Sequence, residues 1–394
     1  MNKLFEEASY VIDQIESRGY KAYFVGGCVR DYCLGRPIKD IDIASSAKPE
    51  EIQAIFPKTI PVGIEHGTVI VRHNHVSYEV TTFRKEGEYE DYRRPSKVWF
   101  VTDLEEDLSR RDFTFNAMAM DKDFQVIDPF EGREDLRNMQ IRTVGEPDHR
   151  LSEDPLRIMR AFRFMSAYDM HIEERTTLAL KKNAPLLKRI STERITVEFK
   201  KLLEGERAGK ALQLMKVCCV FLYLPYPIEE ISEGSMLSFD WSSLETEEQR
   251  WAAVTVLSKV DDERDFLKKW KLPNKVIQSV LAIIFSYKKD QWTKIDLYNM
   301  GLTTALSGLK LRCLIKNDPY EEQAKELTRL AEEINIHSRD DIPLNGEDIV
   351  RIKQKTPGVW LGQLFNDLEK EIVEGKLSLS KREIRDWVRR WGKE

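Results

Sequence analysis

The chain has 394 residues, 41% of them hydrophobic and 33% charged, which is typical of a folded protein with more than one domain and excludes bulk disorder. Its net charge of −5 at pH 7 counts mildly against a nucleic-acid-binding protein, although a local basic face could still bind RNA. No apolar run is long enough to cross a bilayer, and the N-terminus lacks the apolar core of a signal peptide. We therefore predict a cytoplasmic protein without a membrane segment, and nothing in the sequence indicates an obligate protein partner.

The first part of the chain mixes helical and strand patterns. Apolar residues recur with a helical period as far as Gly19, and a short buried run then reads as a strand. The predicted elements are, in order, a helix over 3–18, a strand over 22–25, a short helix over 29–34, a strand over 41–44, and strands over 68–72 and 76–83 that a hairpin at 73–75 joins.

Beyond about residue 148 the strand patterns fade and helical patterns continue to the end of the chain. The predicted helices cover 152–168, 173–185, 191–204, 207–222, 246–259, 274–288, 319–334 and 362–374. An α+β head with a small mixed sheet, followed by an all-helical part, is therefore the predicted fold class.

Asp40 and Asp42 stand two residues apart at the predicted strand over 41–44. Side chains of a strand alternate between its faces, so both carboxylates are expected to point the same way. Convergent carboxylates suit Mg²⁺, and a pair of such ions can activate an attacking hydroxyl and stabilise the leaving oxygen in phosphoryl transfer. Taken alone, such a pair is more often a solvated strand end, so its meaning depends on its neighbours.

Those neighbours indicate a phosphate site. Gly26 and Gly27 follow a buried strand and precede a helix, where backbone N–H groups can approach phosphate oxygens closely. Arg30, one turn into that helix, offers a guanidinium to the same group. Glu79 is the candidate for a third carboxylate on a neighbouring strand, and a solvated, outward-facing role for it is equally compatible with the sequence.

Six runs of residues closely resemble, in consistent order, the signature of class II tRNA nucleotidyltransferases (CCA-adding enzymes) and bacterial poly(A) polymerases. They are 23–31, 34–37, 40–44, 110–117, 128–133 and 153–160. Two positions depart from the pattern: Cys28 replaces the usual small residue after the glycines, and Glu131 replaces the first glycine of the DPFGG block.

The resemblance implies a nucleotidyltransferase head over 1–147, a helical neck over 148–205, a body over 206–316 and a tRNA-binding tail over 317–394. It implies that the protein adds C, C and A to the 3′ end of tRNA from CTP and ATP and releases pyrophosphate. Asp40 and Asp42 would hold Mg²⁺ as the cofactor, with Glu79 as a further catalytic carboxylate.

The resemblance also makes Asp154 and Arg157 the positions that read the nucleotide. To the candidates Gly27 and Arg30 we add Arg111, whose fork of donors suits a triphosphate, and Arg160 and Arg163, which continue the i+3 row of the same helix. We expect Asp154 in the first turn of a helix, where Arg157 at i+3 would be its neighbour. A carboxylate can accept from the amino group of cytosine or adenine, and a guanidinium can donate to the ring nitrogen beside it. In isolation these two residues would rather form a solvated ion pair; in the family these positions select the base.

The stretch 84–95 reads as a mobile loop, and its end, with Asp91, Arg93 and Arg94, resembles the flexible loop that the family uses when it changes from C to A addition. Two alternatives stay open. One is an A-adding enzyme or a poly(A) polymerase of the same superfamily, and the other is a non-catalytic RNA-binding protein on a decayed transferase fold.

Overall fold

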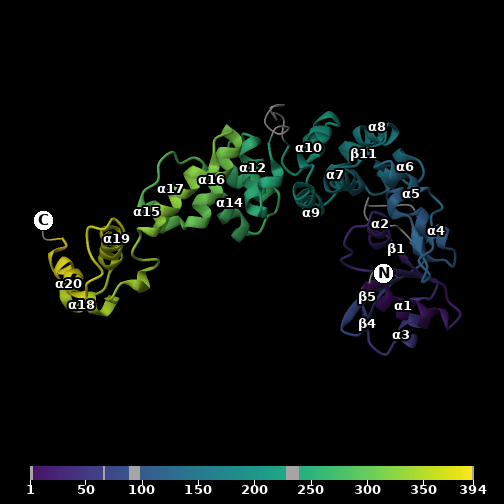
Figure 1. The fold of residues 1–394 in the computed structure, drawn as a ribbon, viewed down its shortest axis with the longest axis horizontal. Coiled ribbons are helices and arrows are strands. Elements are labelled where there is room, and N and C mark those ends of the chain that lie inside the picture. Colours follow the sequence, from purple (N-terminus) through teal and green to yellow (C-terminus); the bar gives the residue numbers. More distant parts are fainter. Residues whose placement is uncertain (1–2, 65–66, 88–97, 228–238, 393–394) are drawn as a thin grey trace. The chain divides into compact units, whose positions relative to one another are not determined.

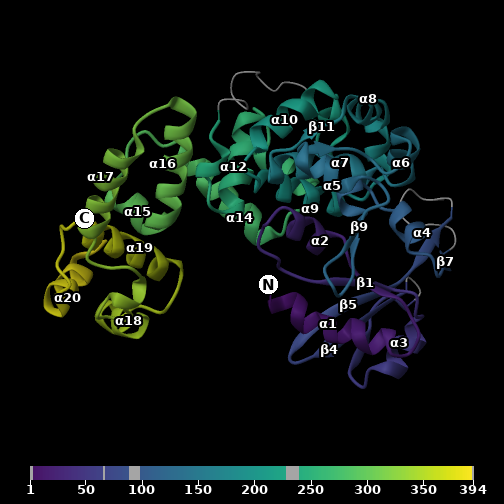
Figure 2. The same ribbon diagram turned by 45° about the vertical axis from the view of Figure 1, so that its right-hand side comes forward.

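The computed structural model describes residues 3–64, 67–87, 98–227 and 239–392 (Figures 1 and 2). The chain divides into two compact units. Unit 1 comprises Met1–Ser242 and Lys269–Lys271, and unit 2 comprises Ser243–Lys268 and Leu272–Glu394. In the part of the chain that the structure describes, no helix is long and apolar enough to cross a membrane.

Unit 1 begins with a mixed seven-stranded sheet in the order β3-β4-β5-β2-β1-β8-β9. Its strands are β1 (Ala22–Val25), β2 (Asp42–Ser45), β3 (Thr59–Pro61), β4 (Thr68–His73), β5 (Val76–Thr82), β8 (Ala119–Met120) and β9 (Val126–Ile127). Only β2 and β5 run parallel, and their register pairs Asp42 with Glu79. This register brings the start of β2 beside the middle of β5, in the central part of the sheet.

Helices α1 (Lys3–Glu16) and α3 (Pro49–Ile55) pack on this sheet, α1 against β1 and α3 against β4 (Figures 1 and 2). The apolar residues of α1 recur at helical spacing and are fully buried, which explains why this segment folds as a helix on the sheet. Helix α2 (Gly27–Cys33) follows β1 directly through the Gly26 turn.

Short elements complete the head. They are β6 (Arg84–Glu86), β7 (Val98–Phe100), α4 (Leu104–Ser109), the 3-10 turn η2 (Thr114–Asn116), α5 (Gly132–Arg137) and β10 (Gln140–Ile141). The rest of unit 1 is mainly helical: α6 (Pro147–Glu153), α7 (Leu156–Tyr168), β11 (His171–Ile172), α8 (Glu174–Asn183), η3 (Ala184–Arg189), α9 (Thr192–Leu203), α10 (Ala208–Val217) and η4 (Val220–Tyr223). Helix α7 packs against both α9 and α10.

Unit 2 is helical in its described residues. The 3-10 turn η5 (Trp241–Ser243) crosses from unit 1 into unit 2. The helices that follow are α12 (Glu247–Leu257), α13 (Glu263–Lys269), whose last residue belongs to unit 1, α14 (Asn274–Tyr287), α15 (Lys294–Met300), α16 (Leu302–Lys316), α17 (Tyr320–Glu332), η6 (Arg339–Asp341), α18 (Gly346–Lys353), α19 (Val359–Val373) and α20 (Lys381–Arg390). Helices α12, α14 and α16 pack together, and α18, α19 and α20 gather near the C-terminus (Figure 2).

The predicted fold class, an α+β head followed by helices, is confirmed, and so is the hairpin at 73–75. Two details are wrong. The helix expected over 152–168 is two helices, α6 and α7, which meet at Asp154 and Pro155. The part of the chain after residue 148 also contains a short strand, β11, which pairs with β10 of the head. The finer division into head, neck, body and tail stays a prediction.

Candidate active site

A cavity of about 550 Å³ opens in unit 1. Eight arginines and four acidic residues line it, so its wall is net positive in a protein whose net charge is −5. All seven residues that the sequence predicts to bind nucleotide are in its wall. The lining residues are Gly26, Gly27, Arg30, Asp42, Arg84, Glu86, Arg110, Arg111, Asp112, Asn116, Asp154, Leu156, Arg157, Arg160, Arg163, Phe164 and Arg194.

The acidic edge of the cavity lies at the start of β2. Asp42 is the first residue of that strand and faces Glu79 across the parallel register, whereas Asp40 precedes the strand. The prediction that both aspartates lie on one strand is therefore wrong. Burial, helped by the charges of Glu79 and Asp40 and opposed by Arg111, raises the pKa of Asp42 to about 6. The charges of Glu79 and Asp40 thus act on Asp42, and of these three carboxylates only that of Asp42 lines the cavity.

This edge suits a cation that arrives with its substrate. In the residues that the structure describes, no three His, Cys, Asp or Glu side chains are grouped closely enough to hold a metal ion by themselves. Mg²⁺ commonly binds through one or two carboxylates and completes its octahedron with water and substrate phosphates. A cation here would also relieve the repulsion that raises the pKa of Asp42. The donor set therefore fits Mg²⁺ together with a bound triphosphate.

The turn at Gly26 brings Arg111 to this edge. Gly26 has a φ of 73°, and a Cβ at this position would lie 2.9 Å from Arg111 Nη1 and 4.0 Å from Asp42 Oδ2. Burial lowers the pKa of Arg111, whose buried Nε has no hydrogen-bond partner within the described chain. A buried donor without a partner costs about 1–3 kcal/mol, which an anion bound at the turn would recover.

Behind the cavity wall lies a buried chain of hydrogen bonds. Arg30 Nη1 donates to Asn116 Oδ1 at 2.9 Å, and Asn116 Nδ2 donates to Asp112 Oδ1 at 3.0 Å. Arg160 Nε donates to the other oxygen of Asp112 at 2.6 Å. Burial works to raise the pKa of Asp112, but Arg160, Asn116 and Arg157 outweigh it and lower the pKa to about 2. Asp112 is therefore an ionised hub between α2 and α7.

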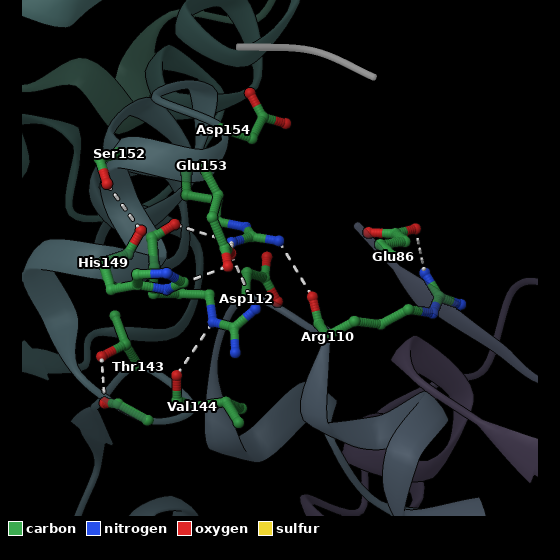
Figure 3. Close-up of polar contacts among 12 residues, drawn as sticks. Glu86, Arg110, Asp112, Thr143, Val144, His149, Ser152, Glu153 and Asp154 are labelled. Carbon is green, nitrogen blue, oxygen red and sulfur yellow. Dashed lines mark hydrogen bonds and ion pairs between the residues drawn. The ribbon is translucent and has the colours of Figure 1, made fainter. Parts of the chain in front are cut away.

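Asp154 is not in a helix, contrary to the prediction. It lies between α6 and α7 with φ −130° and ψ 96°, and its Oδ1 accepts the backbone N–H of Leu156 at 3.1 Å. Arg157 stands in the first turn of α7 but contacts other groups: its Nη1 donates to Glu153 Oε2 at 2.6 Å and its Nη2 to the Arg110 carbonyl at 3.0 Å. Figure 3 labels Glu153, Arg110 and Asp154. The structure gives no ion pair between Asp154 and Arg157 in the described chain, so the solvated ion pair that these residues would form in isolation is absent.

Arg160 and Arg163 continue along α7 and are held in place. The Arg163 Nε lies 3.1 Å from Glu198 Oε2 on α9, and its guanidinium lies 4.2 Å from the centre of the Phe164 ring. Both arginines line the same cavity as Gly26 and Gly27.

Several cavity residues were not among the predicted nucleotide-binding residues. Arg194 on α9 lines the cavity and lies 40 residues after Asp154 in the sequence. Glu198, which contacts Arg163 behind the wall, stands one turn after Arg194. Their signal is present but weak: a charged pair in the amphipathic helix predicted over 191–204. Arg84 and Glu86 of β6 also line the cavity. Asp91, Arg93 and Arg94, predicted for the flexible loop, lie outside the described residues.

Three models of known families match the chain, in the order of its parts. The poly A polymerase head domain matches residues 22–142, the probable RNA and SrmB-binding site of polymerase A matches 169–227, and the putative tRNA nucleotidyltransferase domain 2 matches 242–388.

Full-length relatives agree with these matches. The CCA-adding enzyme of Geobacillus sp. (strain WCH70) is 43% identical over 393 residues, which cover 98% of this chain and 97% of that protein. The crystal structure of the Bacillus stearothermophilus CCA-adding enzyme in complex with CTP aligns with a TM-score of 0.91 at 41% identity, over 98% of this chain and 97% of that one.

A third similarity is more distant. A tRNA nucleotidyltransferase complexed with a primer tRNA and an incoming ATP analog aligns with a TM-score of 0.62 at 25% identity, over 82% of this chain and 98% of that one. Identity above 40% along nearly the whole chain, with every predicted nucleotide-binding residue in one cavity, establishes the relationship. The chain belongs to the CCA-adding enzyme family of tRNA nucleotidyltransferases.

Proposed function

We propose that the protein adds C, C and A to the 3′ end of tRNA from CTP and ATP. The observation that carries this proposal is an arginine-rich cavity whose wall includes Asp42, Asp154 and Arg157. In each step the terminal 3′-hydroxyl of the RNA loses its proton and its oxygen attacks the α-phosphate of the nucleotide, so that a new phosphodiester bond forms. The bond between the α-phosphorus and the oxygen that bridges it to the β-phosphate breaks, and pyrophosphate leaves with that oxygen.

Asp40 and Asp42, with Glu79 beside them, would hold two Mg²⁺ ions. Bound there, the ions supply charge neutralisation at the phosphates and a lower pKa for the attacking hydroxyl. Arg30, Arg111 and the Gly26–Gly27 turn bind the triphosphate, because guanidinium groups match phosphate oxygens with several donors at once.

Asp154 and Arg157 select the base. Arg157 uses both hydrogens of Nη1 and one of Nη2 on Glu153, Arg150 and Arg110, which leaves a second Nη2 hydrogen and the Nε hydrogen for a ligand. The Asp154 carboxylate accepts from the amino group of cytosine or adenine. Uracil and guanine present a carbonyl oxygen at the same place, which a carboxylate repels.

The relatives support this substrate class: one is crystallised with CTP, and another with a primer tRNA and an ATP analog. Because tRNA is processed in the cytoplasm, we place the protein there, and we assign tRNA binding to the helical part over 317–394. The match to a poly A polymerase head keeps A addition alone as the second candidate.

A tRNA transcript that ends before CCA tests the proposal. We expect extension by C residues with CTP alone, completion of CCA with CTP and ATP together, and no long product with ATP alone. Long A tails with ATP alone would identify a poly(A) polymerase, and no extension in any mixture would refute the proposal.

Asp42→Ala tests the carboxylate edge. Loss of this carboxylate removes the cavity-lining ligand of the cation, so we expect nucleotide incorporation to fall by about 10³-fold or more. Binding of tRNA, measured by filter retention, should stay within about twofold of the parent, because basic side chains that contact phosphates supply most of the affinity for nucleic acid and Asp42 is not basic. An active Asp42→Ala enzyme would contradict the metal assignment.

A further inference from the structure

Asp154 and Arg157 carry opposite charges, line the same cavity and stand three residues apart, yet they do not pair. Each is fixed by a separate set of partners instead. Arg157 is held by Glu153 and by two backbone carbonyls. Asp154 is held by the Leu156 N–H and, at 2.8 Å from its Oδ2, by Arg194 Nη2. Because Asp154 and Arg157 do not pair with each other, the carboxylate can still accept a hydrogen bond from a base and the guanidinium can still donate one.

Arg194 is built into a rigid support. It lies in the first turn of α9, where Ile195 is buried and Thr196 Oγ1 donates to the Trp270 carbonyl at 2.8 Å. One turn later the Phe199 ring stacks on Trp270 at 4.7 Å between ring centres. The side chain of Arg194 is only 24% exposed, and its Nη2 lies 2.8 Å from Asp154 Oδ2.

The Arg194–Asp154 contact also keeps the Asp154 carboxylate from other orientations. The charge of Asp154 already acts on Arg160, one turn beyond Arg157 in the same cavity wall. Without Arg194, rotation of the Asp154 side chain would bring its free oxygen to these α7 guanidinium groups, because an uncompensated carboxylate in a half-buried wall seeks the nearest donors. Such a pair would consume the acceptor that cytosine and adenine need.

The Arg194 guanidinium has one further property. Its Nη1 atom is buried and has no hydrogen-bond partner in the described chain, although the residue lines the cavity. A buried guanidinium nitrogen left without a partner is costly, and proteins keep such groups where a ligand or a function requires them. Arg194 therefore combines an ion pair to Asp154 through Nη2 with a second nitrogen that has no partner in the described chain, in a side chain that lines the cavity.

We propose that Arg194 is a positioning residue for base selection: it holds the Asp154 carboxylate away from the α7 arginines, in the orientation that accepts the amino group of C or A. This inference rests on the proposed function, because it needs Asp154 to read the base. Arg194 acts through Asp154, so its loss should alter which nucleotide is used more than how fast the correct one reacts at saturation.

Arg194→Met tests this directly, because methionine keeps most of the side-chain length and removes every donor. With a tRNA that lacks CCA, we expect the ratio of kcat/KM for CTP to that for UTP to fall by about tenfold or more, the size of one lost base-edge contact. The KM for CTP should rise while kcat at saturating CTP changes less than threefold or so. Arg194→Lys, which restores one charged donor, should recover part of the ratio.

Lys201→Ala is the matched control, since Lys201 is an exposed residue of the same helix. It should leave the CTP to UTP ratio unchanged. Thermal unfolding of each variant shows whether it is folded at the assay temperature, and the lysine variant carries the test if the methionine variant is not. A folded Arg194→Met enzyme with the parent ratio and the parent KM would overturn the inference, and so would a folded Arg194→Lys enzyme whose ratio is no higher than that of Arg194→Met. A parent enzyme that adds no C or A would instead refute the proposed function.

Discussion

Gly26 occupies a position where both backbone and space exclude a side chain. Its φ of 73° is unfavourable for other residues, and a Cβ would meet Arg111 Nη1 at 2.9 Å. Arg111 would then have to leave the turn, although the aspartate at the start of β2 and the turn both need it close. The glycine thus sets how closely the Arg111 guanidinium can approach the turn and the Asp42 carboxylate.

Gly26→Ala should therefore damage nucleotide binding as well as stability. We expect the KM for CTP to rise by about tenfold or more, as displacement of one charge-assisted contact predicts, with a loss of roughly 1 kcal/mol in the free energy of unfolding from the left-handed backbone. Gly35→Ala is the control: its φ is 64°, but no atom lies within 4 Å of the added Cβ. It should lose stability by a similar amount and keep its KM; equal KM values for both variants would refute the steric argument.

Asp112 predicts how acid affects unit 1. Its pKa in the folded protein is about 2, below the ordinary value of 3.8, so the folded state binds its proton less readily than the unfolded chain. The resulting stabilisation is fully present above about pH 4 and disappears as the pH falls through about 2. A shift of nearly two pKa units corresponds to about 2 kcal/mol.

Asp112→Asn should remove this dependence. We expect a loss of about 2 kcal/mol or more at neutral pH and a flatter decline in stability between pH 4 and pH 2 than in the parent. Urea unfolding followed by limited proteolysis of unit 1 measures both quantities. A variant whose stability declines as steeply as that of the parent over this interval would show that another group is responsible.

At the scale of elements, the break between α6 and α7 shapes the site more than any helix does. Pro155 disfavours helical backbone at the residue before it, and Asp154 accordingly adopts an extended conformation. An unbroken helix would place the Asp154 carboxylate one turn from Arg157 on the same surface, where the two would pair. The break turns Asp154 toward α9 instead.

Helix α16 depends on close approach to its neighbour α14. A Cβ on Gly308 would fall within 2.3 Å of the Ser286 side chain, so the two helices meet at a glycine. Gly308→Ala should therefore destabilise unit 2 by about 1–3 kcal/mol through overpacking. Gly362→Ala in α19, where no atom lies within 4 Å of the added Cβ, should instead stabilise the helix by up to about 1 kcal/mol. Melting temperatures of the two variants that move in the same direction would contradict this account.

The sequence predicted the features that local pattern determines. The glycine turn, the aspartates and the arginines of α7 follow from short motifs, and the hairpin at 73–75 follows from strand alternation. The break at Asp154 was missed because an apolar helical period runs through 152–168, although Pro155 was a signal against it. Arg194 could not be paired with Asp154 in advance, because only the packing of α7 on α9 joins them. Helix α16 was missed because it is packed on several sides and lacks an amphipathic stripe.

At the scale of the whole molecule, the two units each have a hydrophobic core of their own. Unit 2 contains one contiguous cluster of buried residues from Leu297 to Val388, whereas the cavity lies entirely in unit 1. Two compact units should unfold in two steps, so a single free energy of unfolding would not describe the chain.

Calorimetry with CTP tests this independence. Ligand bound to unit 1 at a hundred times its Kd stabilises that unit by about 2.7 kcal/mol and leaves the other transition in place. The Gly308→Ala substitution should move the opposite transition only. One cooperative transition that both CTP and Gly308→Ala displace would show that the units unfold as a single body.

The buried chain from Arg30 through Asn116 and Asp112 to Arg160 joins two arginines of the cavity wall by hydrogen bonds of 2.9, 3.0 and 2.6 Å. A contact that displaces the arginine at one end alters the partner that the arginine at the other end can use. Thermodynamic linkage then requires reciprocity: if a cytosine in the cavity strengthens the grip on the triphosphate by some factor, the triphosphate strengthens the hold on cytosine by that same factor. Recognition of the base and of the phosphates would then be one cooperative quantity, larger than the sum of the affinities of a nucleoside and of free triphosphate.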